Sequence, residues 1–405
     1  MTNFSAKTIL CLSSYEKGQE FLRECKRQGC HVILLTVTAL EHANWPSESI
    51  DEIFYMPDLS RVEDVMRGVS FLARSRIIDS IVALDDYDVW TAAALREHLR
   101  IPGMGDTTVR YFRDKLAMRV KAQEHGIAVP DFVHVLNYDR IREYMAQVPP
   151  PWMLKPRSEA STIGIAKINA PEEFWPRLDT LGDQQSFYLL ERYIPGEVYH
   201  VDSLTVDREV VFSEAHQYAR PPLDVFHGGG IFVSSTLPRG SEEEHTLKGL
   251  NRQVISTFGL VRGATHMEFI KGQDDSRFYF LETAARVGGA NIVETIEAAT
   301  GINLWREWAK IEIAGEEGTY QLPEHQQNYA GVMVTLARQE FPDTSAYQDP
   351  EIVWRLNKRH HVGFVVAAKD PDRVKSLLDE YTQRVAQDFS TRLPPRESRP
   401  PSREP

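Results

Sequence analysis

The sequence predicts a mixed α/β and α+β fold: an N-terminal domain built on a parallel sheet, a larger central domain, and a small C-terminal α+β unit. Two observations lead to this prediction. Apolar runs alternate with helical segments near the N-terminus, which is typical of parallel sheets with helices on both faces. From residue 152 to about residue 301 the chain changes to short strands, glycine-rich turns and intervening helices, which is typical of an α+β domain.

The N-terminal domain opens with two apolar runs, residues 7–13 (KTILCLS) and residues 31–36 (HVILLT), which we expect to be buried strands. Residues 15–28 between them have helical spacing, and Gly29 is placed to end that helix. A third run, residues 80–84 (SIVAL), leads into two aspartates and a further helical stretch. Because such sheets bind ligands at the carboxyl ends of their strands, we expect a binding site there.

The rest of the chain begins with one long predicted helix and ends with a smaller unit. Residues 107–125 have helical spacing throughout, with Asp106 or Thr107 as the candidate N-cap. Near the C-terminus, residues 329–337 and 363–368 are expected strands, and residues 372–388 are an expected helix.

These patterns divide the chain into five parts. Residues 1–106 form the N-terminal domain, and residues 107–185 and 186–320 form two subdomains of the central domain. Residues 321–390 form the C-terminal unit. Residues 391–405 hold five prolines and four arginines but no aromatic side chain, so we expect a disordered tail.

The composition indicates a globular protein of a reducing compartment. Hydrophobic residues make up 42% of the 405 residues, which is enough for a sizeable core. The formal net charge of −12 argues against broad binding to nucleic acid or to anionic membranes. The three cysteines lack Cys-x-x-Cys spacing, and the sequence shows no secretory signal and no apolar run long enough to span a bilayer. We therefore expect a cytoplasmic protein with no nucleic-acid or membrane partner.

Four segments carry candidate chemistry, and their order along the chain is as informative as their composition. The first is residues 113–115 (RDK), on the predicted long helix. The second is an apolar strand that ends in Lys155 and continues into a loop of small residues, 158–164, which we expect to be a mobile lid. The third is residues 189–197 (LLERYIPGE). The fourth is a pair of glutamates on two strands, followed by an arginine.

These residue types suit phosphate and metal chemistry. The backbone N–H groups of a small-residue loop can surround phosphates, and a lysine adds a positive charge. Glu268 and Glu282 lie in apolar strands, where a buried carboxylate is costly without a cation, and hard oxygen ligands suit Mg²⁺ that bridges phosphates. Arg286 suits charge stabilisation on a transferring phosphoryl group. Together the four segments predict a Mg·ATP site for phosphoryl transfer.

The order of these segments resembles the ATP-grasp superfamily, and within it the ATP-dependent carboxylate–amine ligases of the L-amino-acid (dipeptide) ligase type. The resemblance covers roughly residues 7–390. It implies the ATP-grasp fold, in which a Rossmann-like N-terminal domain precedes a central ATP-grasp domain and a small C-terminal α+β unit. It also implies ATP and Mg²⁺ as cofactors, with Mn²⁺ as an alternative metal.

The resemblance also implies a set of site residues. Lys115 and Lys155 match the two lysines that contact ATP phosphates, and Lys155 and Arg286 are implied to act in catalysis. Glu268 and Glu282 match the metal ligands. The remaining nucleotide-binding positions are Ser161 in the phosphate loop, Glu191, Arg192, Tyr193 and Ile194 in the adenine-binding hinge, and Glu197 and Asp202 near the ribose.

Two positions depart from the family pattern. The usual Glu-x-Asn-x-Arg element is Glu282-Thr-Ala-Ala-Arg286 here, so Ala284 replaces an asparagine that normally binds metal. An alanine methyl group cannot coordinate Mg²⁺, which leaves the number of bound metal ions open. The second departure is Val198, where many relatives have the ribose-binding glutamate, so Glu197, His200 or Asp202 is expected to take that role.

The expected function is ATP-dependent amide or peptide bond formation through an acyl phosphate, between a small-molecule carboxylate and an amine. Amino acids or small peptides are the expected substrates, and a homodimer is common in the family. Two alternatives stay open: a carboxylase resembling biotin carboxylase, and a catalytically inactive ATP-binding module, which Ala284 would favour. An oxidoreductase would need a Gly-x-Gly-x-x-Gly element, which the N-terminal strand ends lack.

Overall fold

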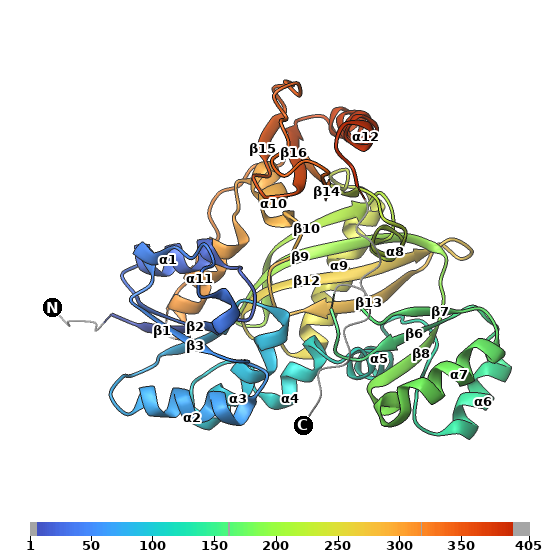
Figure 1. Ribbon diagram of the computed structural model, residues 1–405, viewed down its shortest axis with the longest axis horizontal. Coiled ribbons are helices and arrows are strands. Elements are labelled where there is room, and N and C mark those ends of the chain that lie inside the picture. The colour runs from blue at the N-terminus through green and yellow to red at the C-terminus, as the bar shows by residue number, and fades with distance from the viewer. Residues whose placement is uncertain (1–5, 161–162, 317, 392–405) are drawn as a thin grey trace. The chain divides into compact units, whose positions relative to one another are not determined.

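A computed structural model of the chain describes residues 6–160, 163–316 and 318–391 (Figure 1). The chain divides into two compact units. The larger unit comprises Met1–Ala215, Glu242–Gly288 and Ile302–Glu324, and the smaller unit comprises His216–Ser241, Gly289–Gly301 and His325–Pro405. Ser161 and the tail from residue 392 lie outside the described residues, and every other candidate site residue belongs to the larger unit.

A four-stranded parallel sheet forms the N-terminal part of the larger unit, as predicted. Its strands are β1 (Thr8–Ser13), β2 (His31–Val37), β3 (Glu52–Met56) and β4 (Ser80–Ala83), in the order β3-β2-β1-β4. Its helices are α1 (Gln19–Arg27), α2 (Val62–Ala73) and α3 (Val89–Leu99). Strand β3 was not predicted, because it lies at the sheet edge, where its partly exposed side chains lack the continuous apolar pattern of buried strands.

The predicted single helix over residues 107–125 is wrong, because the chain breaks it into two at Asp114. Helix α4 (Asp106–Val109) and a 3₁₀ turn precede the break, and α5 (Lys115–Glu124) follows it. Asp114 has extended backbone angles, and its carboxylate accepts hydrogen bonds from the N–H groups of Leu116 at 2.9 Å and Ala117 at 3.2 Å. A local aspartate cap of this kind starts a new helix. Lys115 is therefore the first residue of α5.

A second, antiparallel sheet contains the strand with Lys155, which is predicted to bind phosphate, and the strand with Glu191, which is predicted to form the adenine-binding hinge. Its strands are β5 (Phe132–His134), β6 (Trp152–Pro156), β7 (Ala166–Ile168) and β8 (Tyr188–Arg192), in the order β5-β8-β6-β7. Helices α6 (Tyr138–Gln147) and α7 (Pro171–Leu181) share a hydrophobic core with it, centred on Trp152 and Phe174. The antiparallel pairing of β6 with β8 brings Lys155 close to Glu191.

The remaining strands of the larger unit form an antiparallel array in the order β13-β12-β9-β10. They are β9 (Gly196–Val206), β10 (Glu209–Tyr218), β12 (Gly263–Gly272) and β13 (Phe278–Ala284). Helix α9 (Glu242–Phe258) contacts β9 and α5, and α11 (Leu304–Ala314) contacts β9, β12 and α1. A bulge interrupts the β12–β13 pairing, because Phe269 pairs with Phe280 while Glu268 pairs with Glu282, which leaves Leu281 as an extra residue.

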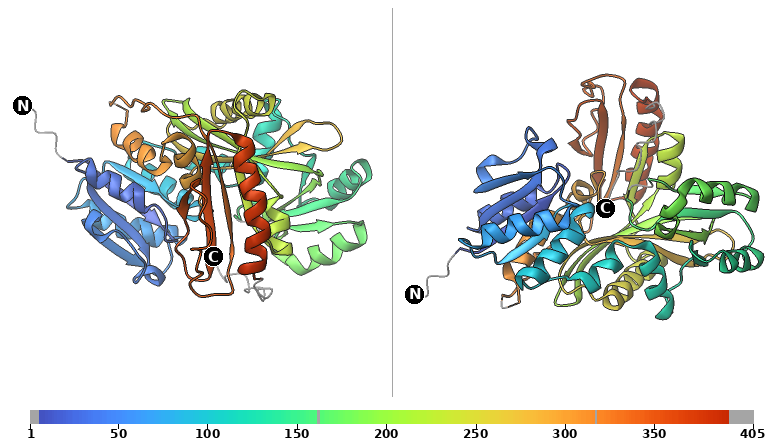
Figure 2. Two further views of the ribbon diagram at one scale, coloured as in Figure 1. Left: turned by 90° about the horizontal axis from the view of Figure 1, so that it is seen from above. Right: turned by 60° about the horizontal axis from the view of Figure 1, so that its bottom comes forward.

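The smaller unit combines an antiparallel sheet with helices of different lengths. Strands β11 (Phe232–Thr236), β14 (Tyr329–Leu336), β16 (His361–Ala368) and β15 (Ile352–Arg355) follow one another in the sheet, and the end of β10 pairs with β11. Its helices are α8 (Pro222–Gly228), α10 (Ile292–Thr300) and α12 (Pro371–Asp388), and α12 runs alongside β14 and β16 (Figure 2). The two C-terminal strands and the helix predicted from the sequence are confirmed, with small shifts of their ends.

Short 3₁₀ turns complete the secondary structure, at Thr38–Leu40, Ser47–Ser49, Asp86–Asp88, Arg110–Phe112 and Gly182–Phe187. Among the helices of the described residues, none combines the length and the apolar character needed to cross a bilayer.

Candidate active site

Lys115, the first residue of helix α5, contacts Glu282 on strand β13. Lys115 Nζ lies 2.7 Å from a carboxylate oxygen of Glu282 and donates a hydrogen bond of 2.7 Å to the carbonyl oxygen of Glu159. Its side chain is only 10% exposed, whereas that of Glu282 is 35% exposed. The backbone N–H of Lys115 also donates to the carbonyl oxygen of Arg157, so both ends of this lysine are fixed. The lysine thus joins a predicted metal ligand to the segment that follows strand β6.

A buried ion-pair cluster connects Lys155 to the hinge strand β8. The Glu191 carboxylate forms ion pairs with Lys155 and with Arg119, whose Nη2 atom lies 2.9 Å away. Burial alone would raise the pKa of Glu191, but the charges of Arg119 and Lys155 outweigh it and hold that pKa below its ordinary value. The sequence analysis did not identify Arg119, although it stands four residues after Lys115 and therefore on the same helix face.

Arg119 also makes a contact with strand β13. Its Nη1 atom donates a hydrogen bond to the carbonyl oxygen of Leu281, the extra residue of the bulge. The bulge thus provides a carbonyl group for a buried guanidinium at the residue next to Glu282. Bulges commonly re-aim side chains beside active sites in this way.

Arg286 is paired with an aspartate at the carboxyl end of the parallel sheet. Its Nε and Nη2 atoms each lie 2.6 Å from the same oxygen of Asp86, in the 3₁₀ turn after β4. Burial opposes the charge of Asp86, but Arg286 and Arg113 keep the pKa of this carboxyl below its ordinary value. The other Asp86 oxygen is buried and accepts no hydrogen bond from any residue that the structure describes. The sequence indicated a ligand at this sheet edge but did not predict the pairing.

Two rows of polar side chains cross the β9-β12-β13 array on one face. In the first row, Glu268 on β12 pairs with His200 on β9 and with Glu282 on β13. Directly opposed carboxylates repel each other unless a cation lies between or beside them. Here Lys115 contacts Glu282, and the Nε2 atom of His266 lies 3.6 Å from Glu268.

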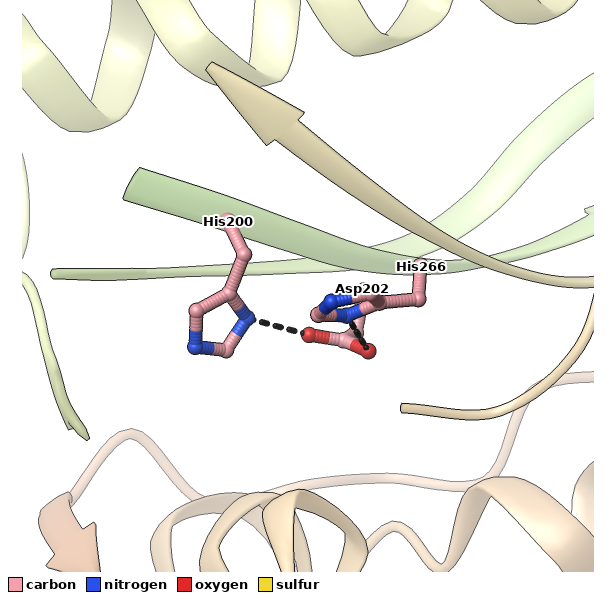
Figure 3. Close-up of side chains that lie close together, drawn as sticks. All are labelled: His200, Asp202 and His266. Carbon is pink, nitrogen blue, oxygen red and sulfur yellow. Dashed lines mark hydrogen bonds and ion pairs between the residues drawn. The ribbon is translucent and has the colours of Figure 1, made fainter. Parts of the chain in front are cut away.

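The second row contains a buried histidine–aspartate–histidine cluster (Figure 3). His266 pairs in register with Asp202 on β9 and with Ala284 on β13. The Asp202 carboxylate accepts hydrogen bonds from Nδ1 of His200 at 2.6 Å and from Nδ1 of His266 at 2.9 Å. Burial would raise the pKa of Asp202, but the two imidazoles hold it far below its ordinary value. Asp202, a predicted ribose contact, is thus fully engaged by protein groups.

The other predicted nucleotide-binding residues lie at the end of β8 and the start of β9. Glu197 is exposed, accepts a hydrogen bond of 2.8 Å from the hydroxyl of Tyr199, and lies on the sheet face opposite to Asp202. Arg192 lies 3.4 Å from Asp131. Tyr193 packs its ring under Lys167, and Ile194 is buried. The structure therefore does not bring Glu197 and Asp202 together, and the ribose-binding residue stays a prediction.

The donor set on β12 and β13 fits a hard divalent cation. Two carboxylates face each other across neighbouring strands, both partly exposed, and each already has a positively charged or hydrogen-bonding neighbour in Lys115 or His266. Mg²⁺ prefers one or two carboxylates together with phosphate oxygens and water. Ala284 lies beside His266 and adds no oxygen ligand, so Glu268 and Glu282 are the carboxylates available to such an ion.

Comparisons with known proteins find relatives in sequence and in fold, although no family model matches the chain. The L-arginine-specific L-amino acid ligase of Bacillus subtilis is 24% identical over 315 residues, which cover 76% of this chain and 75% of that protein. Among solved structures, the L-amino acid ligase from Bacillus licheniformis superposes with a TM-score of 0.73 at 16% identity, covering 95% of this chain and 98% of that one. N5-carboxyaminoimidazole synthetase from Staphylococcus aureus, complexed with ADP, gives a TM-score of 0.70 at 15% identity, covering 92% and 96%.

The two solved structures share their architecture with the fold described above, which confirms the predicted fold class. The parallel sheet and the antiparallel sheets agree with this architecture. The chain therefore has the ATP-grasp fold and is similar, in sequence and in structure, to L-amino acid ligases.

Proposed function

We propose that this protein is an ATP-dependent ligase that joins a small-molecule carboxylate to an amine, with an amino acid or a small peptide supplying the carboxylate. The contact between Lys115 and Glu282 carries the proposal. It brings a lysine suited to phosphate to within 2.7 Å of a carboxylate suited to metal, with Glu268 on the neighbouring strand. Two amino acid ligases support the same reaction, one matched over 76% of this chain in sequence and one over 95% of it in structure.

The reaction needs an activated carboxylate, because the negative charge of a free carboxylate repels an incoming amine. In the first step a carboxylate oxygen attacks the γ-phosphorus of ATP, the bond to ADP breaks, and an acyl phosphate forms. In the second step the amine nitrogen attacks the acyl carbon and loses a proton. The carbon–oxygen bond to phosphate then breaks, and the products are the amide, ADP and inorganic phosphate.

The residues of the larger unit would divide this work between binding and charge stabilisation. Lys115 and Lys155 would bind phosphate oxygens, and Arg286 would stabilise charge on the transferring group and on the tetrahedral oxyanion. Glu268 and Glu282 would hold Mg²⁺, or Mn²⁺ in its place, and the ion would supply charge neutralisation on the phosphates. The two lysines contact Glu282 and Glu191, so ATP would compete with carboxylates for them.

Asp86 supports a substrate that carries a hydrogen-bond donor such as an ammonium group. One of its oxygens is bound by Arg286, and the other is buried without a hydrogen bond from the described residues. An orphaned carboxylate oxygen is costly, and a donor from a bound substrate would satisfy it. Because Asp86 follows β4, it stands at the sheet edge where ligands bind in parallel sheets.

A reducing cellular compartment such as the cytoplasm agrees with the cysteines. Cys11, Cys25 and Cys30 are all buried as free thiols. Free thiols are the usual state where glutathione and thioredoxin keep cysteines reduced.

The deciding experiment measures phosphate release from Mg·ATP by the full chain, across amino acids offered singly and in pairs, with mass spectrometry of the products. Release that requires a pair, with an amide of the matching mass, supports the ligase. Bicarbonate-dependent release without an amide would indicate the carboxylase alternative. Tight ATP binding without release in any mixture would indicate an ATP-binding module and contradict the ligase.

A further inference from the structure

The cluster of His200, Asp202 and His266 is not explained by the proposed ligase reaction. It lies beside the two carboxylates, but its three side chains come from neighbouring positions on β9 and β12 (Figure 3). Each of the three offers one ligand atom, and these atoms all lie within 4.8 Å of one another. His200 and Asp202 are fully buried, and the His266 side chain is 11% exposed.

The spacing of the donor atoms is close to that of a metal site. The two Nδ1···O distances to Asp202 are 2.6 Å from His200 and 2.9 Å from His266. Protein ligands bind transition metals at about 2.0–2.2 Å, which places neighbouring donors about 3 Å apart. Small outward movements of the two imidazoles would therefore let one ion replace the two protons that now bridge the nitrogens and the carboxylate.

The donor types differ from those of the Glu268 and Glu282 pair. Two imidazoles with one carboxylate favour imidazole-binding ions such as Mn²⁺, Fe²⁺, Co²⁺ or Zn²⁺, whereas Mg²⁺ prefers oxygen ligands alone. Ala284 is the third member of the same cross-strand row, and its methyl group places no further donor or bulky side chain beside His266. The two sites would thus be neighbours that select different classes of ion.

We propose that His200, Asp202 and His266 form a divalent transition-metal site, separate from the Mg²⁺ site of the ligase reaction. The ion would link β9 to β12 next to Glu268, because the other ring nitrogen of His266 lies 3.6 Å from that carboxylate. The proposal does not depend on the ligase activity, since all three donors belong to the chain itself and no nucleotide or substrate completes the set.

The alternative is a closed hydrogen-bonded network that holds no metal. Each oxygen of Asp202 already accepts one imidazole N–H, so such a network is satisfied without an ion. The attraction of Asp202 outweighs burial and raises the pKa of His266 to about 10, which favours a proton on this imidazole in the metal-free protein. Metal and protons would therefore compete for the same nitrogens, and only a direct binding measurement separates the two descriptions.

The test uses the full chain without a histidine tag, stripped of metal by a chelator, and titrates it with Co²⁺ in a large excess of Mg²⁺ and without nucleotide. Mg²⁺ occupies oxygen-only sites, so the proposal expects a single equivalent of Co²⁺ that is retained, with the visible absorption bands of nitrogen-ligated cobalt. Proton NMR of the same sample should show two exchangeable imidazole protons with large hyperfine shifts, one from each histidine.

Variants locate the ion. His200→Gln and Asp202→Asn should each weaken Co²⁺ binding by about tenfold or more. Ser203→Ala is the matched control, because Ser203 directly follows Asp202 in β9, points to the opposite face and forms a hydrogen bond with Thr265 instead. Glu282→Gln should leave Co²⁺ binding unchanged, because it alters only the oxygen site.

Two results would overturn the proposal. The first is that folded wild-type protein retains no Co²⁺ against Mg²⁺. The second is that the wild-type protein binds Co²⁺ without the two shifted imidazole protons, which would place the ion elsewhere. The wild-type spectra decide the question even if a substitution in this buried cluster prevents folding.

Discussion

Arg286 and Asp86 form an ion pair in which two nitrogen atoms of the arginine contact one aspartate oxygen. Arg286 follows strand β13, and Asp86 follows strand β4 of the parallel sheet. Both Nε and Nη2 of the arginine lie 2.6 Å from one aspartate oxygen. They are separated by 200 residues in the chain. Asp86 therefore orients the arginine that is expected to act on the transferring phosphoryl group. Asp86 itself lies at the carboxyl ends of the parallel strands, where we expect a substrate to bind.

Replacing Arg286 should stop amide formation while leaving nucleotide binding intact. Loss of a group that stabilises developing charge lowers kcat by about 10²–10³-fold, so Arg286→Ala should show that loss and Arg286→Lys a smaller one. Coupled phosphate release gives kcat, and calorimetry with ADP checks binding. Arg277→Ala, an exposed arginine in the β12–β13 turn, is the control. Normal turnover by Arg286→Ala would contradict the assignment.

Replacing Glu282 should change the metal requirement. Glu282→Gln keeps the size of the side chain but removes the charge that faces Glu268, so the Mg²⁺ concentration for half-maximal activity should rise by about tenfold or more. Asp274→Asn removes an exposed carboxylate from the turn of the same hairpin and should leave the Mg²⁺ dependence as it is. An unchanged dependence in Glu282→Gln would show that this carboxylate does not bind the ion.

Replacing Lys115 should weaken ATP binding. A hydrogen bond to a charged group contributes about 1.5–3 kcal/mol, so Lys115→Met should raise the KM for ATP by about 10- to 100-fold. Lys121→Met changes a lysine on the same helix without a contact to Glu282 and should leave the KM unchanged. Equal KM values for the two variants would mean that Lys115 serves only as the partner of Glu282.

The buried Glu191 cluster should make the larger unit sensitive to acid. Because Arg119 and Lys155 hold the pKa of Glu191 below its unfolded value, the carboxylate contributes stability above about pH 4.5, and this contribution is lost as the pH falls further. Glu191→Gln should lower the free energy of unfolding at neutral pH by about 3–5 kcal/mol, because Arg119 is left buried without its partner.

The same variant should also flatten the acid dependence of stability. Thermal unfolding of wild type and Glu191→Gln at a series of pH values between neutrality and pH 3 measures both effects. Glu124→Gln, at an exposed position at the end of α5, is the control and should follow the wild-type curve. Parallel wild-type and Glu191→Gln curves down to acid pH would contradict the depressed pKa.

The sequence was most informative where local pattern and burial coincide. Strands β1, β2 and β4 are buried along nearly their whole length, so they appear in the sequence as continuous apolar runs. The helix predicted over residues 107–125 was wrong because helical spacing continues through Asp114, whereas the aspartate side chain caps a new helix at that point. Periodicity does not record this competition between a side-chain cap and the backbone.

For the site, motif residues could be found from the sequence, but their partners could not. Lys115 and Glu282 were both candidates, and the structure brings them into contact. Asp86, Arg119 and His266 were missed, because each acquires its importance from a residue that is distant in the chain or on a neighbouring strand. Such pairings depend on strand register and on packing between sheets, which a single sequence does not display.

The extra residue Leu281 makes the length of the β12–β13 hairpin as important as its composition. Phe280 pairs with Phe269 on one side of the bulge, and Glu282 pairs with Glu268 on the other. If Leu281 were kept but paired regularly with Glu268 while the Phe280 pairing held, Glu282 would lie opposite Met267 and turn its carboxylate into the apolar layer beneath the sheet. The pairing of the two carboxylates therefore depends on the bulge, because the unpaired Leu281 is what lets Glu282 lie opposite Glu268. An alignment with a related chain that lacks the bulge therefore needs a one-residue gap here, because without it the metal ligand would be aligned with Leu281.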